Sequence, residues 1–205
     1  AQVALSNNST NLQLVEFDGT NPTVSDIIPA NPSSTFELEL ISGKLVLSVI
    51  DGEYLRVYER NLTGGNWSNV YQKWMLGSTL NVNNTLVMNG GYALYDSNNS
   101  VQGVIHRDSS GNWSSHAIDV PRSETVYDFM VEGDRWHITS TSSGSNNLVW
   151  TTGRFSDSTM VTSTKFMSII TEHMAALESV DGDIVIAYSQ SSTNDFNAIR
   201  LVSDI

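Results

Sequence analysis

Four turns that contain glycine recur along the chain at nearly constant spacing, and this repeat restricts the fold more than any other feature of the sequence. The glycines are separated by 47, 43 and 49 residues, at Gly43, Gly90, Gly133 and Gly182. A second family of turns, rich in Asn, Asp and Gly, lies between them, so two kinds of hairpin alternate along the chain. The spacing therefore predicts a tandem repeat of about 45 residues.

The segments between the turns have the pattern of short β-strands. Phe36, Leu38 and Leu40 alternate with two glutamates, which matches the two-residue period of a strand. Apolar residues almost nowhere follow the 3.6-residue period of a helix. The best helix candidate, residues 169–179, lacks a convincing cap and runs directly into a turn, so we read it as a strand.

A four-stranded unit repeated in tandem is typical of the blades of a β-propeller. Each such unit is apolar on both faces and needs neighbours to cover it. We count three strands at the N-terminus, three complete units and three strands at the C-terminus, which is two strands short of five full blades. The sequence therefore predicts one all-β domain, residues 1–205, forming a five-bladed propeller in which the first strand, residues 2–6, pairs beside the last, residues 199–202. Four blades with an extra hairpin, or a two-sheet β-sandwich, are the alternative architectures.

The charge balance argues against several classes of partner. The chain has 22 acidic and 10 basic side chains, a formal net charge of −12 and no basic run. This charge repels phosphate, so nucleic acid and anionic membrane surfaces are not expected as partners. The apolar stretches are far shorter than the roughly 20 residues that cross a bilayer, so no membrane span is predicted. The absence of cysteine excludes disulfides and thiolate chemistry.

The composition resembles that of an exported protein. Asn, Ser and Thr dominate the connecting segments, and the chain opens without methionine, as a processed product would. We interpret the N-x-S/T sequons as features of a secreted glycoprotein, although a chain this rich in these residues also produces sequons by chance. Seven sequons occur, at Asn7, Asn8, Asn61, Asn66, Asn83, Asn98 and Asn112.

Two of the Asn/Asp-rich turns share a pattern that ends in Trp-Ser. Residues 60–68 read RNLTGGNWS, and residues 107–114 read RDSSGNWS. An Asp or Asn that opens such a turn can accept backbone N–H groups, glycine supplies the left-handed conformation, and the Trp can pack back over the hairpin. These turns resemble the Asp-box hairpins of sialidase-like propellers, except that the glycine follows Asp108 one position later than in that family.

One repeat is also similar to the blades of fungal fucose-binding propeller lectins. The likeness lies in LRVY at residues 55–58 and GGNWS at residues 64–68, and it covers about two of the repeats. It implies sugar pockets between adjacent blades, where an arginine and a glutamate bind hydroxyl groups and an aromatic ring packs on the sugar. Arg200 is a partial counterpart of Arg56. The ligand-binding residues predicted in this way are Arg56, Glu59, Trp67, Trp113 and Arg200.

Sugar chemistry supports the same residue types independently of the resemblance. A pyranose presents a patch of C–H groups and several hydroxyls, which suit an exposed aromatic ring beside planar donors and acceptors. The alternative interpretation is that Trp67 and Trp113 pack on their own hairpins. Trp74, Trp136 and Trp150 lie on predicted strands, so we expect them in the core.

Catalytic patterns are sparse. The four histidines lack the spacing of a zinc site, and no G-x-S-x-G motif occurs. A glycosidase needs two carboxyl groups, which turns at the channel mouth could supply. The acidic residues in such turns are Asp51, Glu53, Asp134, Asp181 and Asp183.

We therefore predict an extracellular, lectin-like module whose partner is a glycan or glycoprotein. A glycoside hydrolase or lyase with carboxylates at the channel mouth, and a protein–protein scaffold completed by a partner chain, are the alternatives. Enzymatic activity and oligomeric state are thus left open. No cofactor is predicted, and calcium is retained only as a candidate for the oxygen-rich segments 96–99 and 181–183, with no ligand assigned.

Overall fold

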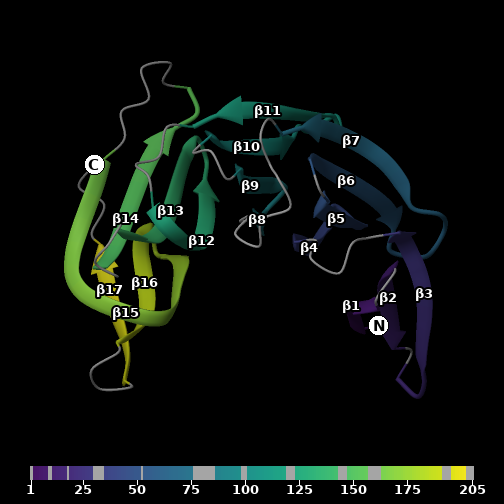
Figure 1. Ribbon diagram of the computed structural model, residues 1–205, viewed down its shortest axis with the longest axis horizontal. Helices are drawn as coiled ribbons and strands as arrows, with labels where there is room; N and C mark the ends of the chain where they lie inside the picture. The colour runs from purple at the N-terminus through teal and green to yellow at the C-terminus, as the bar shows by residue number, and fades with distance from the viewer. Residues whose placement is uncertain are drawn as a thin grey trace.

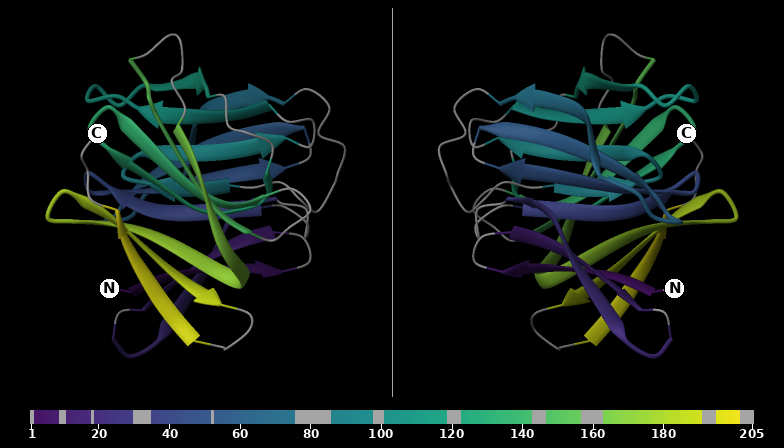
Figure 2. Two further views of the ribbon diagram at one scale, coloured as in Figure 1. Left: turned by 90° about the vertical axis from the view of Figure 1, so that its left-hand side faces the viewer. Right: turned by 90° about the vertical axis from the view of Figure 1, so that its right-hand side faces the viewer.

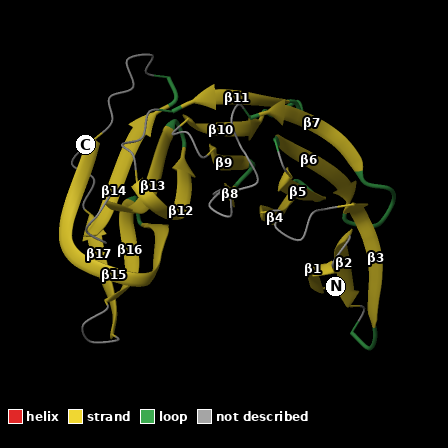
Figure 3. Ribbon diagram, viewed as in Figure 1, coloured by secondary structure: helices red, strands yellow, loops and turns green. Residues whose placement is uncertain are grey.

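The computed structural model describes residues 2–8, 11–17, 19–29, 35–51, 53–75, 86–97, 101–118, 123–142, 147–156, 163–190 and 195–201. These residues form strands and turns, with no helix among them, so the all-β prediction is confirmed (Figure 3). The strands are β1 (Gln2–Asn8), β2 (Asn11–Phe17), β3 (Pro22–Pro29), β4 (Thr35–Ile41), β5 (Lys44–Asp51), β6 (Tyr54–Asn61), β7 (Ser68–Trp74), β8 (Leu86–Asn89), β9 (Tyr92–Ser97), β10 (Val101–Arg107), β11 (Trp113–Ala117), β12 (Ser123–Glu132), β13 (Arg135–Ser142), β14 (Asn147–Arg154), β15 (Ser163–Val180), β16 (Asp183–Gln190) and β17 (Asp195–Leu201).

The strands pair in chain order into four antiparallel sheets. The sheets are β1–β3, β4–β7, β8–β11 and a six-stranded sheet, β12–β17. They follow one another along an arc, with the N-terminal sheet at one end and the C-terminal strands at the other (Figure 1). In the left view of Figure 2 the C-terminal strands lie in front of the central sheets, and in the right view the N-terminal strands do. This succession of meanders confirms the predicted repeat of strand units.

The first strands of successive units form the inner edge of the arc. β4 contacts β8, β8 contacts β12, and β12 contacts β15. In Figure 1, β7 and β11 lie on the outer side of their sheets. Because each sheet thus runs from the inside outward, its faces are turned toward the sheets that precede and follow it along the chain.

One long strand belongs to two meanders. Its first part pairs with β14, where Thr152 lies opposite Ser163, and its last part pairs with β16, where Val180 lies opposite Asp183. The strand predicted at residues 169–179 therefore lies within β15. Counted once for each of its two parts, β15 also reproduces the predicted arrangement of three, twelve and three strands.

The predicted pairing between the first and last strands is wrong for the part of each that the structure describes. β1 pairs with β2, and β17 pairs with β16, and the two end strands share no ladder. They lie at the opposite ends of the arc in Figure 1. Val202, the last residue of the predicted joint, lies outside the described residues.

The predicted glycine turns occur where expected because they need left-handed backbone. Ser42 and Gly43 both have positive φ, 49° and 79°, as do Gly90 and Gly91, 58° and 89°. Two consecutive positive φ values are the geometry of the two-residue hairpin turns that match the twist of antiparallel strands. The turn between β15 and β16 has the same geometry, with φ values of 55° at Asp181 and 83° at Gly182.

Apolar clusters fill the spaces between successive sheets. Val57, Tyr95 and Ile105 pack between β4–β7 and β8–β11, and other clusters fill the remaining interfaces. Trp136 and Trp150 are buried, as predicted from the sequence. The prediction for Trp74 is wrong, since its side chain is 53% exposed on the outer strand β7.

Two glycines on the third strands of their units make room for aromatic rings. Gly153 lies opposite Trp136, and Gly103 lies opposite Tyr95. A Cβ atom on either glycine would overlap the ring of its partner. These aromatic side chains therefore fold across the glycine on the neighbouring strand.

Gly153→Ala is expected to lower the free energy of unfolding by about 1–3 kcal/mol, the usual cost of overpacking. The new methyl group would meet the six-membered part of the Trp136 indole. In a Trp136→Leu background the same substitution should cost much less, because the obstructing ring is gone. Urea unfolding of the four proteins measures both costs, and equal costs would show that Trp136 is not the constraint.

Candidate ligand-binding site

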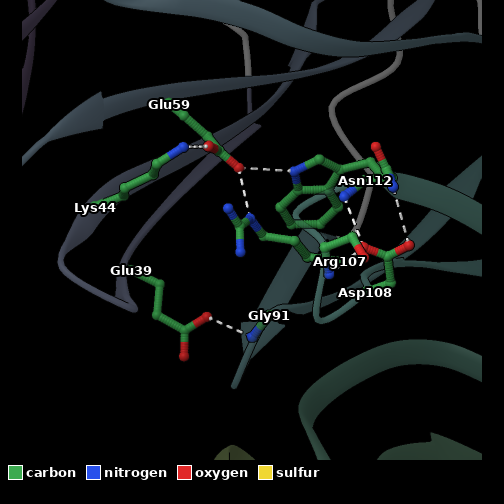
Figure 4. Close-up of polar contacts among 9 residues, drawn as sticks. Glu39, Lys44, Glu59, Gly91, Arg107, Asp108 and Asn112 are labelled. Carbon is green, nitrogen blue, oxygen red and sulfur yellow. Dashed lines mark hydrogen bonds and ion pairs between the residues drawn. The ribbon is translucent and has the colours of Figure 1, made fainter.

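Glu59 lies at the centre of a charged cluster that joins two sheets. Its side chain is only 5% exposed. Lys44 Nζ donates to Glu59 Oε2 at 2.6 Å, and Arg107 Nε and Trp113 Nε1 donate to Glu59 Oε1 at 2.8 and 3.0 Å (Figure 4). Lys44 comes from β5, whereas Arg107 and Trp113 belong to the neighbouring sheet. We call these four residues the Glu59 cluster.

The Glu59 cluster keeps its carboxylate ionised. Burial by itself would raise the pKa of Glu59, but hydrogen bonds from Arg107, Lys44 and Trp113 outweigh burial and hold the pKa below its usual value. The carboxylate is therefore both charged and fixed in position. Such a group is already oriented before any ligand arrives.

A second cluster of similar composition joins β4–β7 to the N-terminal sheet. Arg60 donates from both terminal nitrogens to Glu16, at 2.7 and 3.2 Å. The Arg60 guanidinium lies 5.6 Å from the centre of the Trp67 ring. We call Glu16, Arg60 and Trp67 the Arg60 cluster, and its bidentate ion pair fastens β2 to β6.

An open, polar pocket lies beside both clusters, at the end of β6. Its volume is about 310 Å³. All of its lining residues belong to β4–β7 and to the turn between β6 and β7, and we call it the β6 pocket. They are Lys44, Glu59, Arg60, Asn61, Asn66, Ser68 and Val70.

The structure does not bring the predicted residues Arg56, Glu59 and Trp67 into one pocket. Residues 56 and 59 are three apart on β6, so their side chains point to opposite faces of the sheet. Arg56 pairs with Asp51 at 3.1 Å and donates to Gln72 at 3.3 Å. Of the five predicted residues, Glu59 lines the β6 pocket.

The other predicted residues have structural contacts. Trp67 packs with the apolar cluster between β1–β3 and β4–β7. Trp113 is buried in the cluster between β4–β7 and β8–β11. Both tryptophans therefore pack between neighbouring sheets, whereas the alternative interpretation placed them on their own hairpins. Arg200 forms an ion pair with Asp183 at 2.5 Å, far along the chain from the β6 pocket.

The turn that opens with Asp108 has the predicted hydrogen bonds. Asp108 Oδ1 accepts the backbone N–H groups of Ser110 and Asn112, each at 2.8 Å, and Gly111 has a φ of 90°. These bonds to Asn112 and Ser110 hold the pKa of Asp108 below its usual value. The turn thereby delivers Trp113 to the Glu59 cluster.

Two carboxyl groups on inner strands have raised pKa values. Burial raises the pKa of Glu37 on β4, and the charges of Asp128 and Glu39 raise it further. Burial also raises the pKa of Asp128 on β12, although its carboxylate accepts the N–H groups of Leu177 and Phe129. The charge of Asp128 on β12 therefore acts on Glu37 on β4 across the inner side of the arc.

The calcium hypothesis has no support in the part of the chain that the structure describes. No group of three or more His, Asp or Glu residues there is arranged to hold a metal ion. Asp183 instead forms an ion pair with Arg200, and Asn98 and Asn99 lie outside the described residues.

No helix long and apolar enough to span a membrane is found in the described ranges.

Sequence reasoning missed both ion pairs between sheets, although the repeat carries a signal for them. Glu16 and Glu59 are 43 residues apart, and Arg60 and Arg107 are 47 residues apart. Each arginine directly precedes an Asn/Asp-rich turn. Opposite charges that recur with the period of the repeat indicate contacts between successive units.

The fold is that of the β-propeller proteins. No protein-family model and no curated protein matches the sequence. The β-propeller domain of Cps50 (Swd1) from Myceliophteria thermophila superposes with a TM-score of 0.59 at 9% identity, over 96% of this chain and 65% of that one. At this identity the likeness shows the fold alone.

Two further structures share the arrangement. A protein from Lactobacillus plantarum gives a TM-score of 0.58 at 13% identity, over 93% of this chain and 64% of that one. An exo-β-1,3-galactanase from Phanerochaete chrysosporium, in complex with β-1,3-galactotriose, gives a TM-score of 0.51 at 11% identity, over 96% of this chain and 55% of that one. The chain thus spans less than two thirds of the length of these three structures.

Proposed function

We propose that this β-propeller protein is a carbohydrate-recognition module that binds a glycan in the β6 pocket. The observation that carries the proposal is the convergence of an ammonium group, a carboxylate and two amides in one open pocket of about 310 Å³. This volume lies at the lower end of the range for small-ligand sites. It suits one or two sugar residues rather than a large ligand.

The lining groups match the hydroxyls of a sugar. Lys44 is 39% exposed, so its ammonium can donate to a ligand while it remains paired with Glu59. Asn61, Asn66 and Ser68 are exposed and offer both donors and acceptors. Because Glu59 is already fixed, binding would cost little ordering of that carboxylate.

Binding in this pocket would rest on polar contacts. Among the described lining residues none is aromatic, and Val70 is the one apolar side chain. Trp67, expected from the sequence to carry the sugar, lies against the Arg60 guanidinium instead. The proposed site therefore consists of Lys44, Glu59 and the amides of Asn61 and Asn66. It shares only Glu59 with the three residues predicted from the sequence.

Lys44→Ala is expected to weaken glycan binding by about tenfold or more, since a hydrogen bond to a charged group contributes roughly 1.5–3 kcal/mol. Lys73→Ala is the matched control, because Lys73 lies on β7, outside the pocket lining, and donates to Ser115. Arg56→Ala tests the site predicted from the sequence. A glycan array identifies the ligand, and calorimetric titration with that glycan gives the affinities.

The outcomes separate the two sites. Loss of binding in Lys44→Ala, with Lys73→Ala and Arg56→Ala unchanged, supports the β6 pocket. Loss in Arg56→Ala alone would place the site on the opposite face of β6, and the absence of binding to every glycan would overturn the recognition function. The protein should come from a host without N-glycosylation, because Asn61 and Asn66 both begin sequons on the pocket rim.

A glycoside hydrolase is the second candidate function. It is favoured by the raised pKa values of Glu37 and Asp128, since glycosidases use one carboxyl group that stays protonated. The fold is also shared with a galactanase. Chromatography of the glycans recovered from the binding experiment distinguishes the candidates: intact glycans support recognition, and shortened products that disappear in Glu37→Gln support hydrolysis.

We also infer a five-bladed arrangement and an extracellular location. The blades would be β1–β3, β4–β7, β8–β11, β12 to the first part of β15, and the last part of β15 to β17, in accord with the sheet order. The exposure of Asn61 and Asn66 is compatible with glycosylation during secretion. A scaffold completed by a partner chain remains the third hypothesis.

A further inference from the structure

Two histidines lie side by side on neighbouring strands of β8–β11. His106 on β10 is paired with Ser114 on β11, and His116 stands two residues further along β11. Residues 106, 114 and 116 therefore share one face of the sheet. The ring centres of His106 and His116 are 4.7 Å apart, with an angle of 42° between the ring planes.

The His106 ring is held in place from two sides. Its Nδ1 lies 3.2 Å from Ser114 Oγ, within hydrogen-bonding distance. Its face stacks on Tyr92, with ring centres 5.6 Å apart and an angle of 16°. In the tautomer whose Nδ1–H donates to the Ser114 hydroxyl, Nε2 carries the lone pair and is the ligating nitrogen, and such support is what orients histidine ligands in metal sites.

The His116 ring lies on the open side of this arrangement. The residue is exposed, whereas His106 is half-buried. The centre of the Phe155 ring lies 5.9 Å from the centre of the His116 ring, so Phe155 covers one side of His116. An ion can therefore reach the pair from solvent without moving the core.

We propose that His106 and His116 form a two-histidine site for a divalent transition-metal ion such as Zn²⁺ or Ni²⁺, with water completing the coordination. Metal–imidazole bonds are about 2.0–2.1 Å long, so ring centres 4.7 Å apart are close enough for one ion to bond to a nitrogen of each ring. The site lies on a different sheet from the β6 pocket, so it does not depend on the proposed glycan function.

The surroundings favour a cation and select its type. Asp108 is close enough for its negative charge to act on His106, while its oxygens accept hydrogen bonds within their own turn. The whole chain carries a formal net charge of −12. Imidazole nitrogen suits zinc, nickel and copper, whereas calcium and magnesium prefer oxygen ligands.

The test is a calorimetric titration of the untagged full chain with Zn²⁺ and, separately, with Ca²⁺. We expect one Zn²⁺ per chain and no heat from Ca²⁺. His116→Ala should weaken Zn²⁺ binding by more than about tenfold, since even the loss of a group that only supports a ligand costs 10–100-fold. The matched control is His137→Phe, which removes a histidine that is 3% exposed and should leave binding unchanged.

A second variant separates ligation from support. Ser114→Ala keeps both imidazoles and removes the hydroxyl at His106 Nδ1, so it should weaken Zn²⁺ binding less than His116→Ala does. Retention on an immobilised Ni²⁺ column should follow the same order. Absence of Zn²⁺ binding by the unaltered protein, or equal binding by His116→Ala, would overturn the proposal.

Discussion

Glu59→Gln is expected to lower the free energy of unfolding by about 3–5 kcal/mol, the cost of breaking a buried ion pair by removing one partner. The amide keeps the size of the carboxylate but removes the charge that Lys44 and Arg107 share. Arg107 is only 13% exposed, so its guanidinium would lose its compensation in a place that water reaches poorly. The amide also cannot accept all three of the present hydrogen bonds with its single oxygen.

Arg200→Ala is the matched control for this experiment. It also removes one partner of an ion pair, but Arg200 is 57% exposed, and exposed pairs contribute about 0–1 kcal/mol. Urea unfolding at neutral pH measures both variants. Equal effects of the two substitutions would show that burial is not what makes Glu59 important.

The stability contributed by Glu59 should also depend on pH. Its pKa is lowered in the folded protein, so the contribution is present above the ordinary glutamate pKa and is lost as the pH falls through the folded value. In Glu59→Gln that acid-dependent part should be absent. The prediction thus connects the contact between two sheets with the acid sensitivity of the whole domain.

His137→Phe is expected to remove about 3 kcal/mol of acid destabilisation between pH 6.5 and pH 4. His137 is 3% exposed on β13, and burial lowers its pKa to about 4, against the opposing charge of Glu132. One pKa unit corresponds to 1.36 kcal/mol, which sets the magnitude. The ring stacks on Trp150 with centres 5.9 Å apart, an arrangement that phenylalanine can keep.

The direction follows from proton binding. Below pH 6.5 the unfolded chain protonates this histidine, whereas the folded protein resists until about pH 4, so stability falls as the pH falls through this window. Neither ring nitrogen has a hydrogen-bond partner among the described residues, so phenylalanine loses no such bond. Urea unfolding of both proteins at several pH values measures the difference. Parallel pH profiles would contradict the prediction.

The repeat and its hairpins could be predicted because they are local. A turn with positive φ values needs glycine or a similarly tolerant residue, and this requirement places a glycine in each of the four predicted turns at nearly constant intervals. Alternation of apolar and polar residues then identifies the flanking strands. Trp74 shows the limit of that reasoning, because the fourth strand of a unit is apolar in part but faces solvent on the outer edge.

The candidate site could be predicted only in part, because it depends on contacts between units. Glu59 meets Arg107 across 48 positions of sequence, and Arg60 meets Glu16 across 44. Strand alternation places Arg56 and Glu59 on opposite faces, which the family resemblance alone did not reveal. Which sheet covers each face, and hence which charges are used between sheets, is set by the three-dimensional arrangement.

The continuous strand β15 has a consequence for how such a chain can gain or lose repeats. Every other described strand belongs to one meander only. At those boundaries a duplication or deletion of a repeat can therefore begin and end in a connecting segment. Between β14 and β16 the chain passes from one ladder to the next within a single strand of 18 residues. An exchange at that boundary would cut through paired backbone and leave two incomplete ladders. Recombination that preserves the fold is therefore expected to keep the last two meanders together as one heritable unit.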